Sequence, residues 1–444
     1  MKRSLFRSRR SDTTDHWQES TLRECVTLLT GYPFSSTGFT EKPLDVKLVR
    51  GENVANRRLH WERCKRWPAD GSCELETYQL VKGDIVLAMD GMVVGGLTRV
   101  ARITQDDLPA LLVQRVARLR GAQALDQRFL EYLVSTRDFR DYLWGVQTGT
   151  TISHVSAEQI LQFRFRRPPL SEQRAIARVL GSLDDKIELN RHMNQTLEEI
   201  CRALFKFWFV DFGPVRAKIE GRWKKGESLP GMPADMWDLW PSEFEESEKG
   251  EVPKGWNVEP LTATAKFLNG LACQRYPVED GGGLPVLKIA ELRRGQTLGA
   301  DRASASVSPE YLVQDGDLVF SWSGSLEVKF WYGGRAVLNQ HLFKVTSERF
   351  PLWLPYHWLL SHLDDFRHIA AGKATTMGHI QRHHLDDAPV VVPPTGLVVA
   401  CNRIIGPLLS LVRLGEEQKR ALATLRDTLL PKLLSGEIRV KVDA

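Results

Sequence analysis

The sequence predicts an α+β fold in which two globular domains of mixed α/β structure each precede a long helix. Three observations predict it: an internal repeat with a long period, short apolar runs broken by Gly, Pro and Asp, and a heptad pattern after each of two proline pairs. Short runs bounded by turn residues are typical of strands, whereas sustained heptads indicate long helices. With 444 residues and 42% hydrophobic side chains, the chain has material for two to three domains with real cores.

The repeat places similar residues in the same order in both halves of the chain. Five segments match, and the offset falls from 239 to 225 residues along the chain, as small deletions in the second copy would cause. The matched segments are Trp17, Leu22 and Gly31 with Trp256, Leu261 and Gly270; Gly83-Asp84 with Gly316-Asp317; Gln114-Arg115-Val116 with Gln340-His341-Leu342; 150–155 with 375–380; and Pro168-Pro169 with Pro393-Pro394. The paired Gly-Asp steps predict the same tight turn into the same strand.

The first globular domain is expected over residues 1–168, as strands with a few helices. Its apolar runs at 84–89 and 110–116 are broken by Gly, Pro and Asp. Residues 1–10 are basic, but no apolar stretch follows them, so we interpret them as a mobile tail and not as a secretory signal.

The first long helix is expected over residues 169–212, with Ser171 as its N-cap. A helix from Ser171 to about Phe209 would be about 58 Å long. Two Asn lie near the middle of its apolar seam, where buried Asn can set register at a cost in stability. The seam positions are Ile176, Leu180, Leu183, Ile187, Asn190, Asn194, Leu197, Cys201 and Leu204. The cluster that follows, including Phe207 and Trp208, is more apolar than a two-helix seam requires, and we expect a core or a partner surface there.

A linker is expected over residues 213–255, a second domain over 256–393 and a second helix over 394–436. The linker has loop composition and a solvated acidic run at 243–248. Gly and charged residues interrupt the second seam, which consists of Cys401, Ile405, Leu408, Val412, Gly415, Lys419, Leu422, Arg426 and Leu429. Neither helix can bury its stripe alone, so the two are expected to pack on each other, although a docking face for another protein fits the same pattern.

Several motifs resemble the specificity (S) subunit of a type I restriction-modification enzyme, and together they cover nearly the whole chain. The second helix departs from the family's Pro-Leu-x-Glu-Gln pattern at 394–397, so the motif does not define where that helix begins. The motifs are Gly31-Tyr32-Pro33-Phe34, the segments 168–176 (PPLSEQRAI) and 207–218 (FWFVDFGPVRAK), Gly255-Trp256, and the segment 429–438 (LLPKLLSGEI).

The resemblance implies two target-recognition domains, related by pseudo-two-fold symmetry and separated by two long antiparallel coiled-coil helices. Each domain would recognise one half of a bipartite site in double-stranded DNA. Two methyltransferase (M) subunits and the restriction/translocase (R) subunits would join this chain in the cytoplasm. S-adenosylmethionine, ATP and Mg²⁺ would be used by those partners, for adenine methylation or ATP-dependent cleavage, and this subunit would have no catalytic residues and no cofactor of its own.

Two groups of residues, all cations except Trp61, are the candidate DNA contacts. The first lies in a segment that mixes cations with aromatic rings, and the second is its counterpart in the other copy. Arg can pair with guanine edges and Lys can neutralise phosphates, although a solvated basic loop has the same composition. The net charge of +5 favours a polyanionic partner. The candidates are Arg57, Arg58, Trp61, Arg63, Lys65 and Arg66 in the first group, and Lys288, Arg293, Arg294 and Arg302 in the second.

Motifs for other chemistry are weak or missing. His379 and His383 have helical metal-pair spacing, but Ile380 stands where a metalloprotease needs Glu, so we expect no metal site. Asp317, Glu327 and Lys329 imitate a nuclease constellation, yet a shared turn explains Asp317 better. The six Cys form no Cys-x-x-Cys pair and are expected to be reduced. We also expect no apolar run near the ~18 residues of a membrane span.

Two other functions compete with DNA recognition. One is a single-chain restriction nuclease or methyltransferase, but the sequence has no Gly-rich cofactor loop with an Asn/Asp-Pro-Pro-aromatic motif, and no Gly-x-x-x-x-Gly-Lys-Ser/Thr phosphate loop. The other is a helical scaffold that does not bind DNA.

Overall fold

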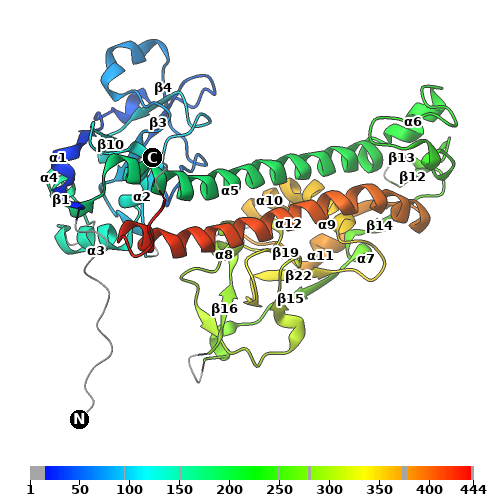
Figure 1. Cartoon of the computed structure of the whole chain (residues 1–444). Coiled ribbons are helices and arrows are strands. Elements are labelled where there is room, and N and C mark those ends of the chain that lie inside the picture. Colours follow the sequence, from blue (N-terminus) through cyan, green and yellow to red (C-terminus); the bar gives the residue numbers. More distant parts are fainter. Residues whose placement is uncertain are drawn as a thin grey trace. The chain divides into compact units, whose positions relative to one another are not determined.

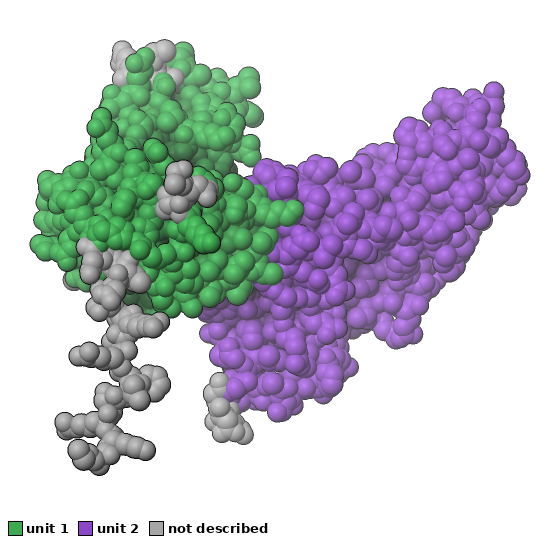
Figure 2. Space-filling view, viewed as in Figure 1, with its two compact units in different colours: residues 1–187, 421–444 green, residues 188–420 purple. Residues whose placement is uncertain are grey.

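The computed structural model describes residues 16–94, 96–149, 153–248, 250–278, 282–372 and 378–441. It divides into two compact units, which are coloured separately in Figure 2. Unit 1 consists of residues 1–187 and 421–444, and unit 2 of residues 188–420. Each unit combines a mixed α/β domain with part of two long helices, α5 (Leu170–Phe205) and α12 (Thr395–Leu434) (Figure 1). The fold is therefore α+β, as the sequence predicts.

The domain of unit 1 is built mainly from short strands. Its four-stranded sheet has the order β2-β10-β5-β8, and a smaller sheet has the order β4-β3-β9 with β3 and β9 parallel. The strands are β1 (Gln18–Thr21), β2 (Val26–Thr30), β3 (Val46–Val49), β4 (Arg66–Trp67), β5 (Ile85–Ala88), β6 (Val93–Val94), β7 (Leu97–Thr98), β8 (Val100–Arg102), β9 (Ala110–Leu112), β10 (Val116–Gly121) and β11 (Arg164–Arg167). The short helices are α1 (Leu22–Cys25), α2 (Gln127–Leu133), α3 (Arg137–Val146) and α4 (Ala157–Leu161).

The domain of unit 2 repeats this plan. Its sheets have the orders β15-β22-β19-β20 and β17-β16-β21-β18, and β16 and β21 are parallel. The strands are β12 (Phe244–Ser247), β13 (Gly250–Pro253), β14 (Asn257–Pro260), β15 (Lys266–Asn269), β16 (Leu284–Leu287), β17 (Arg302–Ala303), β18 (Leu312–Val313), β19 (Leu318–Ser321), β20 (Val328–Phe330), β21 (Ala336–Leu338), β22 (Leu342–Thr346) and β23 (Pro389–Val392). The helices are α6 (Gly213–Ile219), α7 (Leu261–Thr264), α8 (Ile289–Arg294), α9 (Trp353–Ser361), α10 (Leu363–Gly372) and α11 (Arg382–Asp386).

The two domains share strand register as well as strand order. In unit 1, Leu119 of β10 pairs with Leu28 and with Ile85. In unit 2, the residue 226 positions later, Val345, pairs with Phe267 and Leu318, which follow Leu28 and Ile85 at the repeat's own offsets of 239 and 233. The repeat that the sequence predicts is thus confirmed at the level of backbone pairing.

The repeated Gly-Asp steps form the same turn. Gly83 has φ +95° and Gly316 has φ +94°, in the left-handed region that favours glycine. The carboxylate of Asp84 accepts a hydrogen bond from the Val81 amide, as that of Asp317 does from the Gln314 amide. The predicted turn into β5 and β19 is therefore confirmed. The matched segments 150–152 and 375–377 lie outside the described residues.

Both long helices begin directly after a proline pair. The Pro169 carbonyl accepts hydrogen bonds from the amides of Glu172 and Gln173, and the Pro394 carbonyl accepts them from Leu397 and Val398. Helix α5 starts at Leu170, so Ser171 is its second residue, and the prediction that Ser171 is the N-cap is wrong. After Phe205, α5 passes into a π-helical turn over Lys206–Val210.

The two helices run antiparallel. In unit 1 the carboxylate of Asp184 on α5 lies 2.7 Å from the guanidinium of Arg426 on α12. In unit 2 the Asn190 amide donates to the Gln418 side chain (3.1 Å), and the Asn194 amide to the Val412 carbonyl (3.1 Å). In unit 2, residue numbers therefore rise along α5 as they fall along α12. Both Asn side chains are buried, as the seam prediction requires.

Two residues that interrupt the predicted second seam, Gly415 and Lys419, each have a partner in the structure. Gly415 leaves room for Asn194, because a Cβ at Gly415 would lie 2.2 Å from the Asn194 Oδ1 atom. Lys419 pairs with Glu416 on the same helix at 2.6 Å. The helix is therefore continuous through the residues that seemed to interrupt it.

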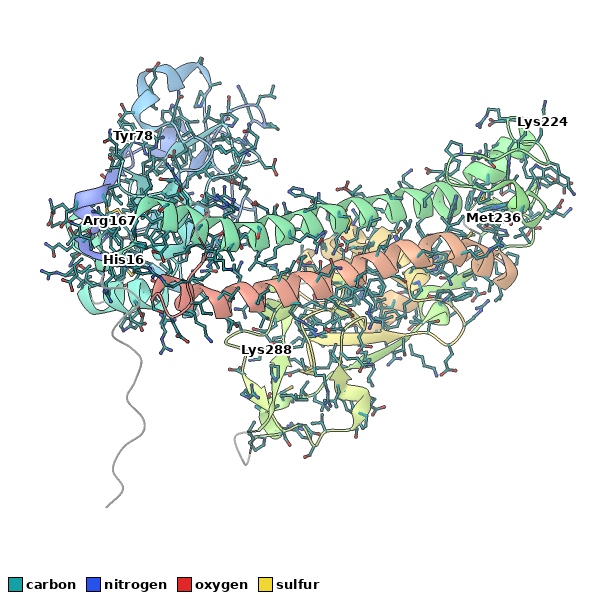
Figure 3. All side chains as sticks on the ribbon, in the orientation of Figure 1. His16, Tyr78, Arg167, Lys224, Met236 and Lys288 are labelled. Carbon is teal, nitrogen blue, oxygen red and sulfur yellow. The ribbon has the colours of Figure 1, made fainter. Side chains whose placement is uncertain are left out.

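The segment expected to be a loop linker folds into unit 2. It carries α6 and the hairpin of β12 and β13, and it buries side chains in the largest apolar core (Figure 3 labels Met236). The prediction of a loop linker over 213–255 therefore misses this packing. The Trp and Met residues of the segment have no periodic spacing in the sequence, so no pattern indicated that they would be buried. The buried residues of this segment in that core are Val215, Ala217, Trp223, Met232, Met236 and Trp240.

The expectation that the chain has no long apolar run needs correction. Among the described residues, α12 contains an 18-residue window with mean hydropathy 1.6, long and apolar enough to cross a membrane by length and composition alone. A core helix passes the same test. Leu397, Cys401 and Ile405 on this helix are buried in the core of unit 2, which accounts for the apolar composition.

Candidate nucleic-acid interface

Arg57, the first candidate DNA contact, lies inside unit 1. It occupies a left-handed backbone conformation (φ +63°), and its side chain is only 15% exposed. The guanidinium lies 3.6 Å from the Asp184 carboxylate and over the ring of Tyr132. Burial lowers the pKa of Arg57, and the nearby Arg426 lowers it further, against the opposing charge of Asp184. This burial argues against the prediction that Arg57 contacts DNA.

Asp184 joins three elements of unit 1. Its carboxylate also accepts a hydrogen bond from the Tyr132 hydroxyl (2.6 Å) on α2 and pairs with Arg426 (2.7 Å) on α12. Burial and the Asp184 charge raise the pKa of Tyr132, which keeps this hydroxyl protonated as the donor. Arg57 therefore serves to fasten its loop to the helices, and it is not displayed to solvent.

The remaining candidates of the first group differ in exposure. Trp61 donates from its indole nitrogen to Asp107 (2.8 Å), Lys65 pairs with Glu41 (2.5 Å), and Arg66 donates to the Asp45 carbonyl (2.8 Å). Arg58 and Arg63 are exposed. The segment keeps a basic surface, but it is smaller than the sequence suggests.

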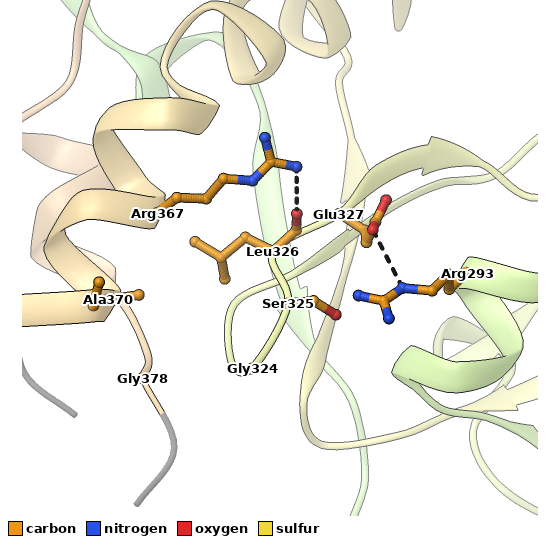
Figure 4. Close-up of a pocket in the computed structure, with 9 residues that line it drawn as sticks. Arg293, Gly324, Ser325, Leu326, Glu327, Arg367, Ala370 and Gly378 are labelled. Carbon is orange, nitrogen blue, oxygen red and sulfur yellow. Dashed lines mark hydrogen bonds and ion pairs between the residues drawn. The ribbon is translucent and has the colours of Figure 1, made fainter. Parts of the chain in front are cut away.

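The four candidates in unit 2 all have partners within that unit. Lys288, labelled in Figure 3, pairs with Asp301, and Arg294 pairs with Glu291. Arg302 donates to the Gly283 carbonyl. Arg293 lies 3.5 Å from Glu327 and lines a cavity of about 440 Å³ with Arg367, as Figure 4 shows. These cations contribute positive charge to the surface, but their ion pairs and hydrogen bonds within unit 2 already fix the orientation of each side chain.

The residues that imitate a nuclease do not assemble one. Asp317 pairs with Lys344 (2.8 Å), whereas Glu327 lies near Arg293 and Lys329. Within the described part of the chain, no group of three or more His, Cys, Asp or Glu side chains could hold a metal ion. The carboxylates therefore serve as partners for cations in this domain.

A polar cluster that the sequence did not single out lies at the turn between β9 and β10. Arg115 donates to the Asp90 carboxylate at 2.6 Å, and the other oxygen of Asp90 lies 2.6 Å from the Nδ1 atom of His154. Burial alone would raise the pKa of Asp90, but the hydrogen bonds from Arg115 and His154 lower it overall. Asp90 is therefore an ionised carboxylate that holds two side chains from separate loops.

Unit 2 has the corresponding cluster at the turn between β21 and β22. His341 stands in place of Arg115, Ser323 in place of Asp90, and His379 in place of His154, at the offsets of the repeat. The Ser323 hydroxyl lies 3.1 Å from the Nδ1 atom of His341, and the rings of His341 and His379 lie about 6 Å from that of Trp322. The repeat pair at 114–116 and 340–342 was the signal that could have located both clusters.

The predicted seam residues separate into two environments. Ile176 and Leu180 pack in the core of unit 1, together with Leu430 and Leu433 of α12. In unit 2, Trp208 is fully buried and Phe207 packs against the same core, so neither is a free docking surface. The other predicted seam positions are partly buried or buried, namely Leu183, Ile187, Asn190, Asn194, Leu197, Leu204, Leu422 and Leu429.

Comparisons with known proteins agree with one another. Residues 14–199 match the family model described as the Type I restriction modification DNA specificity domain. The chain is 25% identical over 328 residues to the type I restriction enzyme MjaIX specificity subunit of Methanocaldococcus jannaschii, covering 70% of this chain and 69% of that one. It is 23% identical to the HindI specificity subunit of Haemophilus influenzae, covering 70% and 77%.

One solved structure of low sequence identity is also similar. The S subunit of the type I restriction-modification system from M. genitalium is 15% identical, with a TM-score of 0.49, and the match covers 94% of this chain and 96% of that one.

Proposed function

We propose that the chain is a specificity subunit of a type I restriction-modification enzyme, which recognises a bipartite DNA site and positions methyltransferase subunits over one adenine in each half. One observation carries the proposal: the two domains share strand order and register, while the polar side chains at equivalent turns differ, with Arg115 in unit 1 and His341 in unit 2. Two such domains are suited to recognise two different half-sites. In this proposal the subunit acts in the cytoplasm and is non-catalytic.

Partner subunits carry the chemistry in this proposal. Methyl transfer from S-adenosylmethionine to an adenine requires the base to leave the stack, and that task falls to the methyltransferase subunits. ATP and Mg²⁺ are used by the restriction subunits for translocation and cleavage. The recognition subunit contributes phosphate contacts, which make affinity salt-dependent, and base contacts, which make it specific.

Exposed apolar residues on the helices support a docking surface for these partners. In unit 2, α5 exposes Leu189 (58%), Met193 (41%) and Ile200 (43%), whose spacing places them on one face of the helix. On α12 of the same unit, Leu411 and Leu414 are exposed by nearly half. Side chains of this kind gain from burial against a partner, which is the role that we propose for them.

The direct test is to map methylation by the assembled complex. The chain is co-produced with its methyltransferase subunits in a host that lacks adenine methylation, and modified adenines are located by sequencing native DNA. We expect one split, asymmetric motif with one methylated adenine in each specified block. The chain alone should neither methylate nor cleave DNA. A continuous motif, or activity of the chain alone, would refute the proposal in favour of a single-chain enzyme.

A further inference from the structure

We propose that Arg115 in unit 1 and His341 in unit 2 are base-contacting residues, and that Arg115 recognises guanine in one half of the bipartite site. This inference rests on the proposed function and extends it to particular side chains.

The two turns share their backbone hydrogen bonds, although Arg115 has a left-handed backbone (φ +65°) and His341 does not. The amides of Gln114 and Gln340 donate to the carbonyls of Tyr32 and Leu271, respectively, each one residue after a glycine of the repeat. Those glycines permit a close crossing of strands, because a Cβ at Gly31 would lie 2.2 Å from the backbone of Val113, and one at Gly270 would lie equally close to Asn339. The fold therefore presents position 115 and position 341 in equivalent places.

Arg115 is poorly explained as a stabilising residue. Its backbone is left-handed (φ +65°), which is unfavourable for a non-glycine residue. Its side chain is 64% exposed, and an exposed ion pair contributes little to stability. Glycine would satisfy the backbone better, so the position is occupied by Arg at a net cost to stability. Strain of this kind, held in place by its surroundings, is characteristic of functional positions.

The environment of Arg115 suits a base edge better than a phosphate. Asp90 holds one terminal nitrogen of the guanidinium and so orients the plane of the group before DNA arrives. The ionised carboxylate of Asp90, next to the guanidinium, would repel a phosphate. The guanidinium nitrogens that Asp90 does not hold can still donate to the neutral O6 and N7 acceptors of guanine. His154 fixes Asp90 from the opposite side, so the orientation is set by three loops.

The same position in unit 2 carries a different set of chemical groups. His341 is bonded to a neutral hydroxyl and lies near the indole of Trp322, and no carboxylate takes the place of Asp90. A ring nitrogen of His341 can form a single hydrogen bond, whereas Arg can form two. Equivalent turns that carry different contact residues are suited to recognise an asymmetric site.

The test compares discrimination by the methyltransferase complex on its own motif and on duplexes changed at each specified base. For Arg115→Gly we expect unchanged or higher thermal stability, because glycine relieves the left-handed backbone. We also expect discrimination at one guanine of one half-site to fall by about 5- to 150-fold, with the other half unaffected. Arg115→Lys should recover only part of it, because Lys cannot form the paired contact. His341→Ala should relax one position in the opposite half.

Arg137→Ala is the matched control, because Arg137 is 81% exposed in the same unit and pairs with Asp141. It should leave discrimination unchanged at every position. The inference is overturned if Arg115→Gly and His341→Ala discriminate like the wild type, or if either relaxes both halves equally. A wild-type complex without a split motif would instead refute the proposed function, so the two failures are distinguishable.

Discussion

At the scale of single residues, the clearest result is the division of charged side chains by burial. Arg57 and Arg58 are neighbours in one basic segment, yet Arg57 lies against Asp184 while Arg58 is exposed. The family motif after the first proline pair has a similar local explanation. Glu172 accepts a hydrogen bond from the indole of Trp17 (3.0 Å), and the buried Gln173 bonds to the Pro168 carbonyl and the Asp126 amide. The motif fastens the start of α5 to the domain before it.

Asp184 provides a prediction at this scale. Asp184→Ala removes the shared counter-charge of Arg57 and Arg426, which would leave two largely buried guanidinium groups near each other. Breaking a buried pair typically costs about 3–5 kcal/mol. We expect a loss of that order in the free energy of unfolding of unit 1, measured by urea denaturation of the full chain.

The adjacent carboxylate is the control for this prediction. Asp185 is 63% exposed and pairs with Arg128, so Asp185→Ala should cost less than about 1 kcal/mol. Equal effects of the two substitutions would mean that the buried cluster has no special role in stability.

At the scale of elements, the helix pair depends on polar fits as much as on apolar packing. Asn194 of α5 occupies the space above Gly415 and donates to the Val412 carbonyl and the Glu416 carboxylate (2.9 Å) of α12. A buried polar contact of this kind fixes register, since a shift along the helix would leave the amide unpaired.

Gly415→Ala tests this fit. In an exposed helix, Gly→Ala usually stabilises by about 1 kcal/mol, but the new Cβ would lie 2.2 Å from Asn194. We therefore expect destabilisation of about 1–3 kcal/mol, typical of overpacking, seen as a lower melting temperature. The double variant with Asn194→Ala should recover part of the loss.

The matched control lies on the same helix. A Cβ at Gly396 would meet no atom within 4 Å, so Gly396→Ala should be neutral or stabilising. If Gly415→Ala behaved in the same way, the Asn194 contact would not determine the register.

At the scale of the whole molecule, the duplicated domain plan predicts modular specificity. The two copies share pairing register but differ in the polar side chains at equivalent turns, so each should recognise its half-site without the other. Replacing residues 256–393 with the corresponding segment of a related subunit should change one block of the methylated motif and leave the other intact. Sequencing of methylated DNA from cells carrying the hybrid measures this. Changes in both blocks would contradict modularity.

The sequence by itself determined the α+β class, the duplication and the two long helices, because strand runs, turn residues and heptads are local patterns whose periods do not depend on distant contacts. The tertiary structure alone decided which cations are buried, why Gly415 belongs in the seam, and how Trp and Met of 213–255 form a core. It also decided that Asp90, Arg115 and His154 meet. These outcomes depend on residues far apart in the chain, and composition cannot show whether a charge faces water or another charge.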